Sequence, residues 1–208
     1  MDKRSWANLM TRVLTLAREH THKGGVIVLF ADWRQLPVAS DASKGSGSPA
    51  GCCAKRKATR RCEVLQGLGT AVPRTPIKPK MQWAGWIWRG VASWDKGNCR
   101  PQKGRFRQQV EFVIWGSNGA LPANRPVPCL PGVFTYPNVT GAARLHQTQK
   151  PLALMRELVR ICLPGGRILD PFAGSGTTLE AANLEGFDAT GIELNKPIYA
   201  IARKRLDS

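Results

Sequence analysis

The segment from Leu169 to Leu194 constrains the fold most strongly, and it reads LDPFAGSGTTLEAANLEGFDATGIEL. A short apolar run, RILD, ends at Asp170 and leads into a glycine turn. Residues 177–185 predict a helix that ends at Gly186, a suitable residue for the turn after a helix. DATGIEL then predicts a second strand. Strand, helix and strand joined by short turns indicate an α/β domain with a parallel sheet.

Two interpretations of the turn compete. Residues 170–172 (Asp-Pro-Phe) could form an acid–proline–aromatic catalytic cluster, or the glycines at 174–176 could admit a cofactor. The turn falls at the carboxyl edge of the predicted sheet, where open α/β folds bind ligands. It lacks the lysine of a phosphate-binding P-loop, and Leu179 stands where a dinucleotide loop has a small residue. The pattern favours a nucleoside-type ligand, whose ribose hydroxyls could donate to Glu193 at the end of the next strand.

The remaining chain predicts further elements of the same kind of fold. Residues 5–20 predict a helix with an apolar face of Trp6, Leu9, Val13, Leu16 and Ala17. The run VIVLFADW predicts an interior strand of a parallel sheet, because it is apolar on both faces. Residues 83–97 and 107–119 predict an antiparallel pair of strands, followed by an irregular proline-rich stretch.

Two more helices are expected nearer the carboxyl end. Pro151 opens one of them, since proline is favourable at a helix start. Its apolar face carries Leu152, Met155, Val159 and Cys162. Asn195 could cap the last helix, which begins near Pro197.

Five of the seven tryptophans lie between Trp83 and Trp115. Trp86 and Trp88 share a strand face, and Trp94 continues it if no bulge intervenes. These side chains could stack on nucleic-acid bases, but packing between the sheet and its helices is favoured. The loop between the two strands carries four basic residues that fit phosphate contact or an ordinary solvated loop equally well: Arg100, Lys103, Arg105 and Arg107.

The chain is strongly basic, with 31 Lys and Arg against 14 Asp and Glu, which gives a net charge of +17. Such a balance favours a polyanionic partner, most often nucleic acid. Residues 43–82 carry nine basic residues and one acidic residue, and they are rich in Gly, Pro and Ser. This segment predicts a disordered insertion, or a basic arm on a nucleic-acid backbone, within a single domain formed by 1–42 and 83–208.

Cysteine spacing and hydropathy narrow the class of protein further. None of the six cysteines forms a C-x-x-C pair, so free thiols are favoured over a zinc site or a disulfide framework, and no metal is expected. No apolar run approaches the roughly 20 residues of a membrane span. The first residues, MDKRSWANLM, lack the apolar core of a secretory signal. We therefore expect a cytoplasmic protein without a membrane partner.

DPFAGSGTT, GIEL and HQTQKP together resemble the amino-group DNA methyltransferases, which modify adenine N6 or cytosine N4. The match is to the permuted class, and FADWRQLP, WIWRGVASWDKG and FRQQVEFVIWGSNG resemble its phage and prophage members. The resemblance covers 5–42 and 83–206. It implies a Rossmann-like α/β fold, S-adenosylmethionine as cofactor and double-stranded DNA as partner. Matched onto this chain, the cofactor-binding residues are His146, Thr148, Lys150, Pro151, Asp170, Phe172, Gly174, Ser175, Gly176, Thr177 and Glu193.

Other interpretations stay open for some of these residues. Lys150 and Pro151 could be a plain helix start, and Glu193 could be a solvated strand end. Asp32 and Trp33, at the end of their strand, could line the substrate side.

The sequence lacks the family's catalytic motif, Asp, Asn or Ser followed by Pro-Pro and an aromatic residue. No catalytic residue is therefore assigned. The resemblance implies an amino-terminal truncation that removes a central strand and an edge strand, which leaves an incomplete fold. Such a chain is expected to fold poorly, to re-pair its sheet, or to borrow a strand and the catalytic motif from a second chain. The two functions left open are a methyltransferase, defective as this chain stands, and a non-catalytic nucleic-acid-binding remnant that keeps the cofactor loop.

Overall fold

The computed structural model describes residues 3–31, 84–141, 144–146 and 148–207. Asp32, Trp33 and the predicted insertion at 43–82 lie outside the described residues. Within the described part, no helix is long and apolar enough to cross a membrane. The elements in chain order are α1 (Lys3–Glu19), β1 (Val26–Ala31), β2 (Ile87–Asp95), β3 (Val110–Ser117), β4 (Val133–Thr135), α4 (Leu152–Val159), β5 (Arg167–Asp170), α5 (Thr177–Leu184), β6 (Asp188–Gly191) and α6 (Lys196–Leu206).

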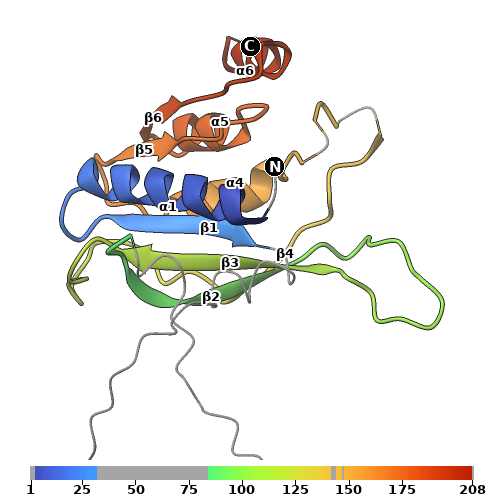
Figure 1. Ribbon diagram of the computed structural model, residues 1–208, viewed down its shortest axis with the longest axis horizontal. Helices are drawn as coiled ribbons and strands as arrows, with labels where there is room; N and C mark the ends of the chain where they lie inside the picture. The colour runs from blue at the N-terminus through green and yellow to red at the C-terminus, as the bar shows by residue number, and fades with distance from the viewer. Residues whose placement is uncertain (1–2, 32–83, 142–143, 147, 208) are drawn as a thin grey trace, which may run out of the picture.

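Four strands form the larger sheet, in the order β1-β3-β2-β4 (Figure 1). β3 pairs antiparallel with both β1 and β2, which confirms the predicted antiparallel pair. The expectation for VIVLFADW was wrong, because β1 pairs antiparallel with β3 and stands at the edge of the described sheet. The proline-rich stretch is also not wholly irregular, since β4 forms there and pairs parallel with β2.

The second sheet contains only β5 and β6, which run parallel with Ile168 opposite Ala189. This confirms the strand–helix–strand unit predicted for 167–194, although the second strand ends at Gly191, before Glu193. Figure 1 shows β5 and β6 above β1, with α1 drawn across the interval between the two sheets. Among the described strands, β1 pairs only with β3, and β5 pairs only with β6. A sheet divided at this place agrees with the expected incomplete fold.

Helix α4 joins the two sheets through the main hydrophobic core. Its buried side chains are Leu154, Met155, Leu158 and Val159. They pack with Trp94, Val113 and Phe134 from the larger sheet and with Ala181 from α5. One amphipathic helix therefore buries apolar surface of both sheets at once.

Helix α1 covers the opposite face of the larger sheet. Leu14 is buried there with Ala31, Trp86 and Ile114. The predicted apolar face was partly wrong, because Leu9 and Leu16 are 40% and 55% exposed. The helix carries apolar residues over a wider arc than the flat sheet can cover, and the strip around Leu14 and Ala17 makes the contact.

A bulge in β2 decides where the tryptophans point. The register with β3 shifts between Trp88 and Gly90, so Arg89 is the extra residue. Trp86 and Trp88, before the bulge, therefore face α1, whereas Ala92 and Trp94, after it, face α4. Trp86 packs in the core under α1 and Trp94 in the core under α4, each at most 2% exposed. Packing rather than base stacking is confirmed for these two side chains.

Candidate functional site

The loop after β5 is held against the end of β6 by backbone hydrogen bonds. Ile192 N–H donates to the Asp170 carbonyl, and Ala173 N–H donates to the Ile192 carbonyl, both at 2.9 Å. The Asp170 side chain turns back on the same loop, where its Oδ1 accepts from Phe172 N–H at 3.0 Å. Phe172 itself is 54% exposed. The chain therefore leaves the sheet in one defined direction, with an aromatic face open beside the turn.

The two glycines of the loop have different surroundings. Gly174 has φ +55° and Gly176 has φ +80°, so both adopt the left-handed conformation that glycine favours. A Cβ at Gly174 would meet no other chain segment within 4 Å. A Cβ at Gly176 would lie 3.1 Å from Ala202 Cβ of α6. Gly174 leaves the surface of the loop open, whereas Gly176 allows α6 to pack closely.

Glu193 ties this loop to the chain that follows β6. Its Oε2 accepts from Gly174 N–H at 3.0 Å, and its Oε1 accepts from Asn195 N–H at 2.7 Å. Each carboxylate oxygen has a further lone pair available. Glu193 is therefore a fixed, partly buried acceptor beside Gly174 rather than a freely solvated strand end.

The residues at the start of α5 are buried, and α6 packs against Gly176 and Thr177. Ser175 and Thr177 are 3% and 6% exposed. Thr177 Oγ1 accepts from Arg205 Nη1 at 2.8 Å, and the same nitrogen lies 3.1 Å from Glu180 Oε2. The hydroxyl of Thr177 is therefore used in packing α6. The predicted cap of that helix is confirmed, because Asn195 Oδ1 accepts from Ile198 N–H at 3.2 Å.

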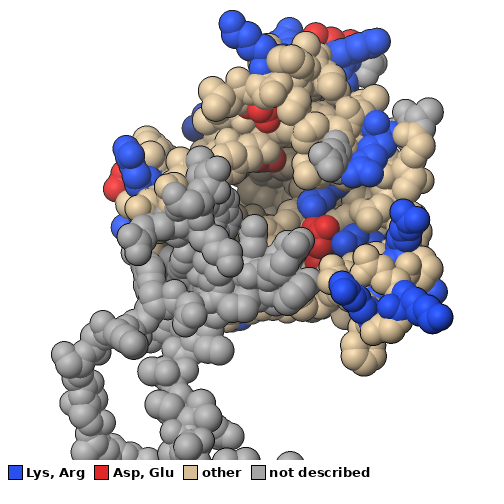
Figure 2. Space-filling view, turned by 45° about the vertical axis from the view of Figure 1, so that its right-hand side comes forward, with Lys and Arg blue, Asp and Glu red and all other residues tan. Residues whose placement is uncertain are grey.

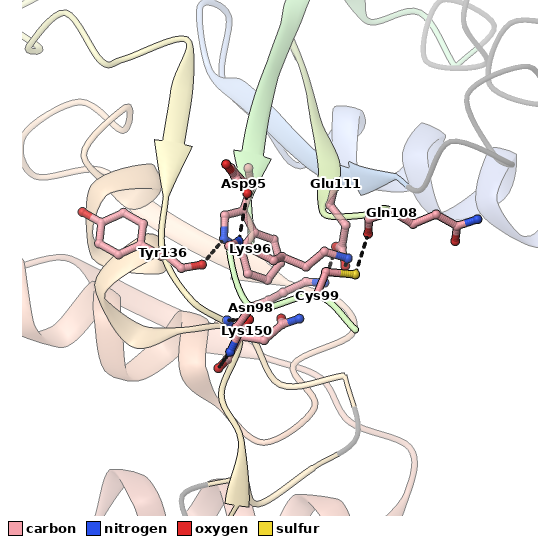
Figure 3. A network of polar contacts seen from close by, with 11 residues as sticks. Asp95, Lys96, Asn98, Cys99, Gln108, Glu111, Tyr136 and Lys150 are labelled. Carbon is pink, nitrogen blue, oxygen red and sulfur yellow. Dashed lines mark hydrogen bonds and ion pairs between the residues drawn. The ribbon is translucent and has the colours of Figure 1, made fainter. Parts of the chain in front are cut away.

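Among the predicted residues before α4, Lys150 contacts a different part of the molecule, near the start of β3 (Figure 3). Lys150 Nζ lies 2.7 Å from Glu111 Oε2 and 4.7 Å from the centre of the Phe30 ring. Lys96 Nζ lies 3.4 Å from the other oxygen of Glu111. The position of Lys150 is therefore not explained by the helix start alone. Its ammonium group forms an ion pair with β3 and a cation–π contact with β1.

Around this ion pair the surface is hollowed by a small cavity of about 150 Å³. Its lining residues are Glu111, Asn138, Val139, Arg144, Thr148, Gln149 and Lys150. His146 Nδ1 lies 3.1 Å from Thr148 Oγ1. Pro151 is buried and caps α4, whose first helical residue is Leu152, and its carbonyl accepts from Met155 N–H at 3.1 Å.

Two groups near α4 have shifted acidities. Tyr136 O–H donates to Glu157 Oε1 at 2.5 Å, and this hydrogen bond to a carboxylate raises the pKa of Tyr136. Burial raises the pKa of the Cys162 thiol. Both groups therefore stay protonated at neutral pH, and neither supplies a base.

The structure divides the predicted site residues into two groups. Residues 170–177 form the loop between β5 and α5, to which Glu193 is hydrogen-bonded, while Lys150 contacts β1 and β3. Figure 2 shows a hollow between the carboxyl-terminal part and the sheet, with acidic side chains at its rim. Sequence reasoning missed Glu111. Its signal was a single carboxylate within the otherwise apolar run VEFVIW.

Comparisons with known proteins agree with this architecture. Residues 129–204 match the family model for DNA methylases. The type II methyltransferase M.ScaI of Streptomyces caespitosus is 35% identical over 107 residues, which are 48% of this chain and 35% of that protein. M.SmaI of Serratia marcescens is 29% identical over 165 residues, covering 64% of this chain and 56% of that protein. The chain therefore spans about a third to a half of the length of these relatives.

Solved structures show the same fold over most of the chain. The M1.HpyAVI–SAM complex aligns with a TM-score of 0.65 and 22% identity, covering 95% of this chain and 82% of that one. TTHA0409 of Thermus thermophilus aligns with a TM-score of 0.60 and 19% identity, covering 97% and 78%. The carboxyl-terminal part of the chain resembles the DNA methylases in sequence, and the described residues share the fold of these solved structures, with their strands divided between β1 and β5.

Proposed function

We propose that the loop at 170–177 and Glu193 bind S-adenosylmethionine, and that the chain serves methylation of adenine N6 or cytosine N4 in double-stranded DNA. The observation that carries the proposal is the arrangement at Gly174. A Cβ added there would meet only the Phe172 carbonyl oxygen, at 3.9 Å, and Glu193 Oε2 is fixed 3.0 Å from the Gly174 backbone nitrogen. A ligand can therefore approach the backbone next to an oriented acceptor.

The residues of the loop fit a nucleoside cofactor. Glu193 keeps lone pairs for ribose hydroxyls, and Asp170 keeps its Oδ2 for a polar group of the ligand. Phe172 offers an exposed ring for an apolar or cationic part. The buried Ser175 and Thr177 hold the loop in place, which refines the direct contact that the resemblance implied for them.

When bound, S-adenosylmethionine supplies an electrophilic methyl group. An exocyclic base amine is a poor nucleophile, because its lone pair is delocalised into the ring. A transferase therefore needs hydrogen-bond acceptors beside the amine and an aromatic face that holds the flipped base. No acid–Pro–Pro–aromatic motif occurs in this sequence to provide them.

We infer that a strand carrying such a motif pairs between β1 and β5, and that a second chain can supply it. The described edges of β1 and β5 that have no strand partner support this, because unpaired backbone groups form a template for another strand. The net charge of +17 supports DNA as the partner.

The second candidate is a DNA-binding protein that binds the cofactor without turnover. It is favoured by one observation, the absence of the catalytic motif from the sequence. Both candidates bind the cofactor at the same site, but only the first transfers the methyl group to DNA.

One experiment separates them. The purified chain is shown to be folded by circular dichroism, titrated with S-adenosylmethionine by calorimetry, and assayed for methyl transfer to unmethylated DNA. Binding with transfer supports the enzyme, and binding without transfer supports the second candidate. Glu193→Ala tests the site, because it should weaken binding at least tenfold. A folded chain that binds no cofactor would contradict both candidates.

A further inference from the structure

The loop between β2 and β3, residues 96–109, concentrates positive charge around one aromatic side chain. This basic loop contains Lys96, Arg100, Lys103, Arg105 and Arg107 and no acidic residue. All residues from 101 to 108 are exposed. Phe106 is 99% exposed and stands between two arginines. Most of a phenylalanine ring is normally buried, so its complete exposure at a basic tip needs a reason.

Hydrogen bonds hold the two ends of the basic loop, whereas its tip is exposed to solvent. Lys96 N–H donates to the Gln109 carbonyl at 2.9 Å, and Cys99 Sγ donates to the Gln108 carbonyl at 3.3 Å. Asn98 and Asn138 exchange two hydrogen bonds, of 3.2 Å and 3.0 Å. A Cβ added at Gly104, near the tip, would meet nothing within 4 Å. Figure 1 shows the loop extending well beyond the end of the sheet.

The anchored end lies beside the cavity at Lys150. Asn138, to which the loop is bonded, also lines that cavity, and Lys96 shares Glu111 with Lys150 (Figure 3). Figure 2, which brings this side forward, shows Lys and Arg side chains gathered at the lower right of the face. A polyanion lying along these side chains would therefore pass the rim of the hollow.

We propose that the basic loop is a DNA-binding arm in which Arg105 and Arg107 contact phosphates and Phe106 stacks on a base. The inference rests on the proposed function only in taking DNA as the partner. Arginines that contact phosphates on either side would bring the ring to the duplex, where an apolar side chain can insert between base steps and stack on a base. Stacking requires a ring that is not already packed, and Phe106 meets that condition.

The test measures binding of a fluorescently labelled DNA duplex by anisotropy between 50 and 200 mM salt. Phe106→Ala should weaken binding roughly 5- to 100-fold without changing the salt dependence, since stacking releases no counterions. Phe106→Trp should restore the affinity, and Phe106→Leu should not. Replacing Arg105 and Arg107 together by Gln should lower the slope of log K against log salt by about 1.8, or 0.9 for each phosphate contact.

Lys204→Gln is the matched control, because it removes an exposed charge from α6, outside the loop. It should leave the effect of Phe106 unchanged. If Phe106→Ala bound the duplex as tightly as the wild-type chain, or if Phe106→Leu restored the full affinity, the stacking role would be overturned. The proposed function would remain intact in either case. A preference for an RNA duplex of the same sequence would contradict DNA as the ligand. If the folded wild-type chain bound S-adenosylmethionine but no DNA, the DNA-binding role of the basic loop would be refuted. The cofactor site would not be.

Discussion

Gly174 and Gly176 look equivalent in the sequence but have different tasks in the folded loop. Both have positive φ, yet only Gly176 is pressed against α6. Gly191, in β6, is a third case. Its φ is ordinary for a strand, but a Cβ there would lie 2.5 Å from Leu179 Cδ1 and 2.8 Å from Ala173 Cβ. Backbone conformation and open access thus require glycine at position 174, conformation and packing require it at position 176, and packing alone requires it at position 191.

An alanine series at these three positions should separate the contributions to stability. Gly174→Ala carries only the backbone strain of positive φ, about 1–2 kcal/mol. Gly176→Ala adds a tight contact with Ala202 and should cost about 2–4 kcal/mol, while Gly191→Ala should cost about 1–3 kcal/mol by overpacking. Urea unfolding measures the differences. Equal losses at Gly174 and Gly176 would contradict the close packing of α6.

Glu111 should hold Lys150 in place through a charge-assisted hydrogen bond. Both side chains are mostly buried, at 22% and 24% exposed, so Glu111→Gln should lower the free energy of unfolding by about 1–2 kcal/mol. A double-mutant cycle with Lys150→Met measures the coupling. Arg203→Met, at an exposed ion pair with Asp207, is the control and should change stability by less than about 0.5 kcal/mol. A coupling of zero would contradict the pairing.

At the scale of elements, the helices and most strands could be predicted because their periodicity, caps and turn glycines are local. α4, β5, α5, β6 and α6 were found in this way. β4 could not be found, because three residues carry no period and pair with β2 only through the fold. The antiparallel setting of β1 was missed for a similar reason. An apolar run shows that both faces are covered but not which strand pairs with it.

The bulge at Arg89 accommodates one extra residue, so that Trp86 and Trp94, eight positions apart, face opposite sides of the sheet. The Arg89 side chain donates to Ser117 Oγ at 2.9 Å and to the Gly119 carbonyl at 3.1 Å. Deleting Arg89 would leave Trp86 and Trp94 seven positions apart in a regular strand, so they would still face opposite sides and each core would keep its tryptophan.

The deletion is therefore expected to keep cooperative thermal unfolding, measured by near-ultraviolet circular dichroism, and to remove only the hydrogen bonds of Arg89. Arg89→Ala keeps the bulge and removes only its hydrogen bonds, so it should cost about 1 kcal/mol. A deletion variant that unfolds without cooperativity, while Arg89→Ala unfolds cooperatively, would contradict this account of the two tryptophans.

The candidate site could be predicted only in part. The glycine turn and Glu193 follow from local spacing, and the structure brings them together. The structure adds that Ser175 and Thr177 are buried and that Lys150 pairs with Glu111. These contacts depend on how α6 packs on α5 and on how β3 lies beside residue 150, which the sequence does not display.

At the scale of the whole molecule, two sheets share one helix but no hydrogen-bonded edge within the described part. Amides of β3, which is paired on both sides, should exchange hydrogen slowest. Alternate amides of β1 and β5 face the unpaired edges and should exchange much faster. Hydrogen-exchange mass spectrometry with fragmentation checks this expectation.

Adding a peptide with the acid–Pro–Pro–aromatic strand of a related methyltransferase should slow those fast amides. A peptide of scrambled sequence is the control and should have no effect. Uniform protection of β1 in the isolated chain would show that its outer edge is already covered, and this would contradict the proposed strand from a second chain.

The division between β1 and β5 also has a consequence for the life of the chain inside a cell. Unpaired strand edges attract chaperones and seed aggregation, and loosely closed domains are cut by proteases. The steady-state abundance of this chain should therefore rise when a chain bearing the complementary strand is made at the same time. Supply of that second chain, rather than transcription of this one, would then set how many working copies accumulate.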